Sequence, residues 1–211
     1  MHAAPTDLEL AALISSKICH DVINPVGAIV NGLEMLDEDD DAESKVYALN
    51  MIRNVTQQAS ARLQFARFAF GAAGSAGSQI DVGMAETISR GFLGTGKHKL
   101  VWHLTPGYMG KDHVKLLLNL VASAITALPR GGEIDVAMSG TVAVPTFVIR
   151  CIGTGARAPQ YLVDFLGTAT PPALDAMNIQ AYYTWRLAGT TAMAIDIKKV
   201  GDEVVLTASP A

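Results

Sequence analysis

The chain has 211 residues, of which 50% are hydrophobic and 17% are charged. This composition excludes a disordered chain, and the length allows one large domain or two small ones. Sixteen Lys and Arg residues against 20 Asp and Glu residues give a net charge of −4. The chain therefore lacks the positive surplus that a nucleic-acid binder needs, and we expect no nucleic-acid partner.

No segment has the pattern of a membrane span or a secretion signal. The most apolar stretch, residues 116–128, is 13 residues long and contains Asn119, Ser123 and Thr126. A membrane-spanning helix needs about 20 predominantly apolar residues. Residues 1–5 lack a basic segment followed by an apolar one. We therefore expect a cytoplasmic protein without a membrane partner.

The cysteines and histidines give no sign of a metal or a disulfide framework. Cys19 and Cys151 lie far apart and form no CxxC motif, and the five His residues show no metal-ligand spacing. We expect a reduced protein that binds no metal of its own.

The predicted elements begin with two long helices. Apolar residues recur at helical spacings over residues 7–36 and again over residues 44–70, which predicts two amphipathic helices. Asp7 is the expected N-cap of the first helix, with Glu9 in its first turn. The acidic run 37–41 is expected to form a solvated turn between the helices.

A hairpin of two such helices needs a partner. At about 1.5 Å per residue, each helix is over ~40 Å long, and a lone hairpin exposes half of each apolar stripe. Two hairpins that pair into a four-helix bundle cover both stripes. We therefore expect residues 1–70 to form a dimerisation hairpin and the chain to be a homodimer.

The pattern changes to mixed α/β after a linker. Residues 71–79, GAAGSAGSQ, are small and lack apolar periodicity. In residues 80–211, helices are expected at 83–93, 111–128, 158–166 and 173–188, and strands at 98–104, 133–139, 144–151, 192–198 and 203–208. The last two strands flank Gly201-Asp202 and predict a hairpin. The predicted fold class is α+β, with a helical hairpin followed by a two-layer α/β sandwich.

Residues 20–25, HDVINP, carry the clearest chemical signal. If Ile18 and Val22 face the core, His20 between them faces water. An exposed imidazole is a good nucleophile toward an activated phosphoryl group. The alternative is an ordinary surface histidine.

Three neighbours of His20 could act with it. Asp21 could hold the imidazole in its reactive tautomer, or it could be an ordinary solvated charge. Asn24, one turn on, shares the His20 face and could touch the reacting groups of a docked partner. Pro25 removes the backbone bond to the carbonyl of Asp21 and loosens the helix beside His20, or it is a tolerated kink that only aims the rest of the helix.

Small residues continue along this face. Gly27, Ala28 and Asn31 lie on it, and Gly27 and Ala28 lower the relief of the helix surface. A partner helix could therefore approach closely, and close packing within the bundle is the alternative.

With these features, residues 8–70 resemble the dimerisation and histidine-phosphotransfer region of bacterial sensor histidine kinases. The H-D-x-x-N-P block matches the H-box of that family. The resemblance implies that His20 is the phosphorylated residue, that Asp21 is the acidic residue after it and that Asn24 is the polar residue before the proline.

Residues 80–211 resemble the ATP-binding (GHKL) domain of the same family, with three departures. The magnesium-binding Asn falls at Ser123, the adenine-reading Asp falls at Cys151, and the glycine-rich box falls at residues 177–183, which contain no glycine. These losses remove a metal ligand, the acceptor for the adenine amino group and the backbone curl around the phosphates. The resemblance implies a retained fold without a nucleotide cofactor.

The combination of this histidine region with a degenerate kinase-like domain is similar to the ChpT-type histidine phosphotransferases of alphaproteobacteria. Residues 16–34 carry the closest likeness. The resemblance implies that the receiver domain of a hybrid histidine kinase passes a phosphoryl group to His20, and that His20 passes it to response regulators of the CtrA and CpdR kind. The receiver would supply Mg²⁺, and it would dock on a surface formed by Lys17, Asn24, Gly27, Ala28 and Asn31.

Two alternatives stay open at this point. One is an active kinase core that phosphorylates His20 from ATP, which the three departures disfavour. The other is a non-enzymatic dimeric scaffold in which His20 is incidental.

Overall fold

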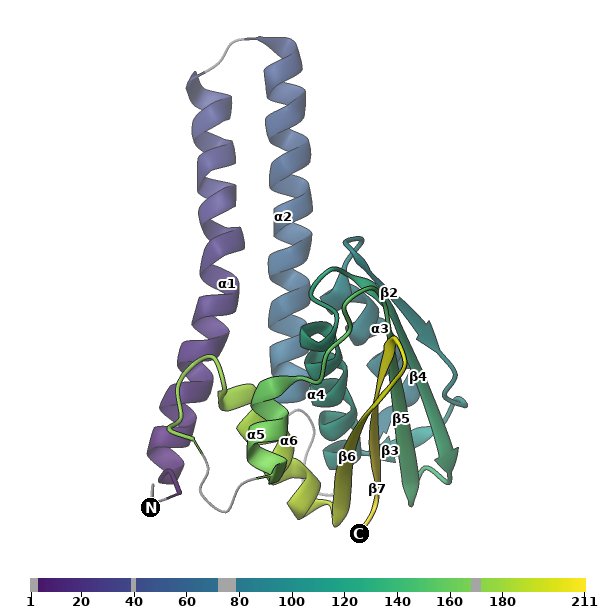
Figure 1. The fold of residues 1–211 in the computed structure, drawn as a ribbon. Helices are drawn as coiled ribbons and strands as arrows, with labels where there is room; N and C mark the ends of the chain where they lie inside the picture. The colour runs from purple at the N-terminus through teal and green to yellow at the C-terminus, as the bar shows by residue number, and fades with distance from the viewer. Residues whose placement is uncertain (1–3, 39–40, 72–78, 168–171) are drawn as a thin grey trace.

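The structure is a computed structural model that describes residues 4–38, 41–71, 79–167 and 172–211. Two antiparallel helices stand beside a sheet that is covered by further helices (Figure 1). The helices are α1 (Asp7–Glu38), α2 (Ala42–Ala69), α3 (Val82–Leu93), α4 (Lys111–Ala127), α5 (Gln160–Gly167) and α6 (Ile179–Thr190). The strands are β1 (Gln79–Asp81), β2 (His98–Trp102), β3 (Tyr108–Gly110), β4 (Gly132–Gly140), β5 (Pro145–Ile152), β6 (Met193–Val200) and β7 (Glu203–Pro210). The predicted α+β class is confirmed.

The start of α1 differs from the prediction by one residue. Thr6, not Asp7, caps the helix: its Oγ1 accepts from the backbone N–H of Glu9 at 3.3 Å, and its own N–H donates to Glu9 Oε2 at 2.8 Å. This reciprocal pair is a capping box, and a Thr with a Glu three residues later is its sequence signature. The backbone N–H and the hydroxyl of Thr6 both donate to Glu9 Oε2 at 2.8 Å, and they hold the pKa of the Glu9 carboxyl below its usual range.

The predicted turn between the long helices is shorter than the acidic run. Asp37 and Glu38 belong to α1, and Asp41 is the N-cap of α2, where its carboxylate accepts from the N–H of Ser44 at 2.9 Å. Residues 39–40 lie outside the described part of the chain.

Helix α2 packs on both parts of the molecule. Ala48 and Ala59 are buried in the hairpin, whereas Phe65, Ala66 and Ala69 near the C-terminal end are buried where α2 meets the α/β part. The ring of Phe65 stacks on Phe92 of α3 with centroids 3.8 Å apart. The hairpin is therefore fixed against the α/β part through the end of α2.

The α/β part is a sheet with helices packed on it. The five strands run in the order β2-β4-β5-β7-β6, with β2 parallel to β4 and every other neighbouring pair antiparallel. Helix α4 is buried along most of its length and contacts β4, β5 and β7. The five predicted strands and the β6–β7 hairpin are confirmed, and Gly201 in its turn has φ 61°, which glycine adopts without strain.

Two predictions in this part are wrong in detail. A second sheet of two three-residue strands, β1 and β3, was not predicted, because three residues are too few to show alternation. The last helix begins at Ile179 rather than at residue 173. Asp175 accepts from the N–H of Met177 and Asn178 and so builds a turn before the helix.

The predicted linker, 71–79, falls largely on residues 72–78, which lie outside the described residues. Its last residue, Gln79, begins β1.

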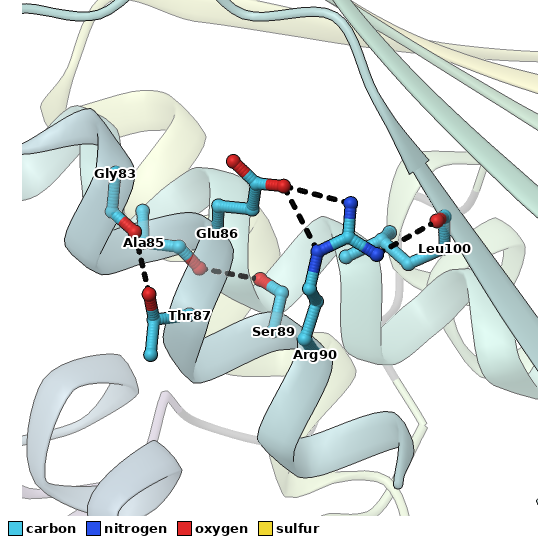
Figure 2. A network of polar contacts seen from close by, with 7 residues as sticks. All are labelled: Gly83, Ala85, Glu86, Thr87, Ser89, Arg90 and Leu100. Atoms are coloured by element: carbon cyan, nitrogen blue, oxygen red, sulfur yellow. Dashed lines mark hydrogen bonds and ion pairs between the residues drawn. The ribbon is translucent and has the colours of Figure 1, made fainter. Parts of the chain in front are cut away.

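The outer edge of the sheet at β2 is covered by an arginine. Arg90 of α3 donates from Nη1 to the carbonyl of Leu100 at 3.1 Å, and Glu86 holds the guanidinium at 2.7 Å and 2.9 Å (Figure 2). The bond occupies a carbonyl of an edge strand that could otherwise pair with another chain.

The contact between α1 and α2 leads to a first prediction, at Gly32. A Cβ atom there would lie 2.6 Å from Cγ1 of Ile52 and 3.0 Å from Cε of Met51. Gly32→Ala should therefore lower the free energy of unfolding, measured by urea titration, by about 1–3 kcal/mol.

Gly27 on the same helix provides the matched control. A Cβ atom there meets nothing within 4 Å, so Gly27→Ala should raise the free energy of unfolding by up to ~1 kcal/mol through helix propensity. Equal effects of the two substitutions would contradict the close approach of α1 and α2 at Gly32.

Candidate functional site

His20 lies near the middle of α1 with its imidazole in solvent. The side chain is 74% exposed, as expected from its place between Ile18 and Val22. Both of these neighbours are half-buried. An imidazole in this position is accessible to a macromolecular partner.

Asp21 connects His20 to Lys17. Asp21 Oδ1 lies 3.6 Å from Nδ1 of His20, and Asp21 Oδ2 forms an ion pair with Nζ of Lys17 one turn earlier. The predicted contact of Asp21 with the ring is therefore present, at a distance just beyond hydrogen-bond length. Because it engages Nδ1, Nε2 is the nitrogen left for reaction.

The other residues predicted for partner binding follow His20 along α1. Asn24, Gly27 and Asn31 are exposed at spacings of four, three and four residues, which places them on the His20 face. Ala28 is half-buried beside them. The structure thus brings Lys17, Asp21 and His20 into contact, with an open, low-relief face above them.

Arg62 of α2 reaches this part of α1 and was not predicted. Its Nη1 donates to the backbone carbonyl of Asp21 at 3.0 Å. The available signal was indirect: Pro25 has no N–H for the Asp21 carbonyl, so some other donor was needed. Which residue of the second helix meets Asp21 depends on the turn between the helices.

A cavity of about 370 Å³ lies between the hairpin and the α/β part, with His20 on its wall. The residues from α1 and α2 that line it include His20, Asp21 and Arg62, and those from the α/β part include Ser123 and Gln180. The helical turn that carries His20 therefore lines the same cavity as two of the segments that resemble degenerate nucleotide-binding boxes. This arrangement was not predicted.

The polar groups on the α/β side of this cavity bind to one another. The hydroxyl of Ser123 donates to the carbonyl of Asn119 at 2.9 Å, and the side-chain amide of Gln180 donates to the same carbonyl at 2.8 Å. Fully buried Asn119 donates to the carbonyl of Ala69 at the end of α2, at 3.1 Å. The Ser123 hydroxyl, at the position that the resemblance to sensor kinases aligns with a magnesium-binding Asn, thus bonds back into its own helix.

Cys151 is fully buried near the C-terminal end of β5, the central strand of the sheet, between Ile134 and Val204 of the neighbouring strands. Burial is the main reason that the pKa of its thiol is raised to about 12. A neutral thiol in this place cannot accept a hydrogen bond from adenine as a carboxylate would.

These residues do not fit a nucleotide with its magnesium ion. The cavity lining from the α/β part contains no charged side chain among the described residues. Residues 179–183 form the first turn of α6 and are buried or half-buried, so this segment is not a glycine-rich loop of the kind that curls around phosphates. Within the described ranges, no group of three or more His, Cys, Asp or Glu side chains could hold a metal ion.

None of the helices that the structure describes is both long enough and apolar enough to cross a bilayer.

Comparison with known proteins defines the class. The family model of the histidine phosphotransferase C-terminal domain matches residues 82–203. The chain therefore belongs to the histidine phosphotransferase family, and the predicted enzyme class, a phosphotransferase, is confirmed.

Particular relatives narrow the class further. The protein phosphotransferase ChpT of Brucella abortus (strain 2308) is 43% identical over 202 residues, which cover 95% of each chain. A solved structure of a bacterial phosphotransferase superposes with a TM-score of 0.90 at 38% identity and covers 98% of both chains. The predicted resemblance to ChpT-type phosphotransferases is confirmed. The histidine kinase AdeS of Acinetobacter baumannii also matches, with a TM-score of 0.47 at 14% identity, over 91% of this chain and 97% of its own.

The burial of Cys151 predicts a thiol that is unreactive in the folded protein. In a Cys19→Ser background, Ellman's reagent at pH 8 should leave Cys151 unmodified, because the thiol is buried and its raised pKa keeps the thiolate scarce. The same protein in 6 M guanidinium should react with one equivalent. Complete reaction of the native protein within minutes would contradict the placement of Cys151.

Proposed function

We propose that this chain relays a phosphoryl group between receiver domains through His20, without binding ATP. The donor is an aspartyl phosphate on the receiver of a hybrid histidine kinase, and the acceptors are receiver aspartates of response regulators of the CtrA and CpdR kind. The observation that carries the proposal is the exposed imidazole of His20 with Nδ1 turned toward Asp21.

In the forward step, Nε2 of His20 attacks the phosphorus atom. The P–N bond forms as the bond between phosphorus and the carboxylate oxygen of the receiver breaks, and the receiver recovers a free aspartate. With Nδ1 still protonated, the phosphorylated ring carries a positive charge beside the carboxylate of Asp21. The reverse sequence on a second receiver returns the imidazole.

The transition state of such a transfer is loose and spreads negative charge over the equatorial oxygens, so catalysis is mostly positioning and charge stabilisation. We propose that the receiver brings Mg²⁺ and the acceptor aspartate, while this chain supplies the nucleophile and a docking face. Lys17, Asn24, Gly27, Ala28 and Asn31 form that face, and Asn24 is the one expected to touch the reacting groups.

We also propose that the hairpin, residues 1–70, pairs with a second copy. Ile23, Val26, Val30 and Leu33 follow one another at spacings of three, four and three residues, and their exposed fractions lie between 44% and 66%. On α2, Leu49 and Leu63 are each 49% exposed. This stripe lies beside the His20 face, so a four-helix bundle would cover it and leave His20 open.

The relay predicts a transfer that needs His20 and no nucleotide. Mixed with Mg²⁺ and a hybrid-kinase receiver domain whose aspartate carries a labelled phosphoryl group, the wild-type chain should take up the label without ATP. His20→Ala should lose it completely while the fold and oligomeric state are kept, because His20 is exposed. Gel autoradiography after acid and alkaline treatment identifies phosphohistidine by its acid lability.

Two outcomes of this assay would favour the other readings. Label that enters His20 from ATP and not from a receiver would identify a kinase with a working nucleotide site. Label from neither source, with a panel of receivers from the same genome, would favour the scaffold.

The dimer has its own test in two neighbouring residues. Val30→Glu places a charge in the apolar stripe and should convert the dimer to a monomer, measured by sedimentation velocity. Asn31→Glu changes the next residue, which lies on the His20 face, and should leave the dimer intact. A wild-type monomer, or a dimer that Val30→Glu does not weaken, would contradict the proposed four-helix bundle.

A further inference from the structure

Pro25 creates a local defect in α1. It lies inside the helix and is buried. Because a proline has no N–H, the carbonyl of Asp21 one turn earlier loses its normal helical donor. A backbone carbonyl in a half-buried place is costly to leave without a partner.

Arg62 of α2 fills this defect from the neighbouring helix. Its Nη1 donates to the carbonyl oxygen of Asp21 at 3.0 Å, across 41 residues of sequence. Arg62 is half-buried and lines the same cavity as His20 and Asp21. The bond joins the two helices at the turn that carries His20.

Asp21 is therefore held at two points. Its carboxylate pairs with Lys17, and its backbone carbonyl accepts from Arg62. The carboxylate also faces Nδ1 of His20. Any rotation of this turn about the helix axis moves the imidazole and its carboxylate together.

We propose that Arg62 is a positioning residue for phosphoryl transfer, which acts by holding the backbone carbonyl that Pro25 leaves without a donor. The inference rests on the proposed role of His20 as the phosphoryl carrier. Arg62 touches neither the imidazole nor the phosphoryl group in this mechanism; it sets the angle at which Nε2 meets the receiver. A displacement of about 1 Å at such a site costs up to roughly 100-fold in rate.

A second mechanism for Arg62 would be direct attraction of the phosphoryl group by its charge. The two mechanisms differ in how Arg62 depends on Pro25. In the Pro25→Ala protein the new N–H can bond the carbonyl of Asp21 as in a regular helix. The positioning role then becomes dispensable, whereas a direct charge effect would persist.

The test is a double-mutant cycle on single-turnover transfer. The donor is a hybrid-kinase receiver domain whose aspartate carries a labelled phosphoryl group, and it is mixed with the chain and Mg²⁺ at saturating and half-saturating concentrations. We expect Arg62→Met to lower the saturated rate by roughly 10- to 100-fold, with the receiver concentration at half-saturation changed by less than about twofold. Arg62→Lys keeps an N–H donor on this side chain and should therefore recover most of the rate that Arg62→Met loses.

In the Pro25→Ala background, Arg62→Met should cost less than about threefold. Any effect of Pro25→Ala itself cancels, because each loss is measured within one background. Equal losses in the two backgrounds, or no loss in either, would overturn the inference. A loss confined to the half-saturating concentration would overturn it as well, since it would assign Arg62 to docking.

Two controls separate this result from folding and from the proposed function. Arg53→Met removes an exposed arginine of the same helix, which donates to Asn50, and should leave the rate unchanged. If Arg62→Met unfolds by circular dichroism, recovery of fold and rate in the Pro25→Ala, Arg62→Met pair still tests the carbonyl. A wild-type chain that accepts no label would refute the relay itself, before any comparison of variants.

Discussion

The position of the whole site depends on one helix, α2, which is part of two packing units at once. Along its first half it packs on α1, through small side chains such as Ala48. Near its end it packs on α3 and α4, where Phe65 stacks on Phe92 and the carbonyl of Ala69 accepts from buried Asn119. Since terminal carbonyls of a helix need partners, this bond closes α2 against the α/β part and sets the cavity beside His20.

The polar contacts of the α/β part support the proposal that this part keeps its fold without binding ATP. Ser123, Gln180 and Asn119 satisfy one another and the end of α2. Cys151 packs as an apolar residue in the sheet centre. Buried polar groups are tolerated when each has a partner, so these internal contacts satisfy the polar groups and keep the surface that supports α2.

The sequence predicted the long helices and the five main strands because their apolar periods extend over many residues. It did not predict β1 and β3, which are three residues each, or the turn before α6, where Asp175 and Asn178 bind backbone groups. The exposure of His20 and its contact with Asp21 followed from positions close together in one helix.

The cavity and Arg62 lay beyond sequence reasoning for a physical reason. Both arise where segments distant in sequence meet, and the meeting point depends on the turn length and on the packing of α2 against α3 and α4. Pro25 indicated that the Asp21 carbonyl lacks a helical donor, but only the structure identified the donor.

The weakness of the contact between Asp21 and His20 fits the proposed relay. A carrier that passes a phosphoryl group on must not hold it too tightly, because binding that stabilises an intermediate more than the transition states on either side slows the second step. Asp21 lies 3.6 Å from Nδ1, is partly solvated and is shared with Lys17. Each of these features weakens its attraction for a charged phosphoimidazole relative to a short buried ion pair. The same carboxylate still orients the ring, because its backbone is fixed through Arg62. The proposed relay needs this combination, because the phosphoryl group must leave His20 for a second receiver.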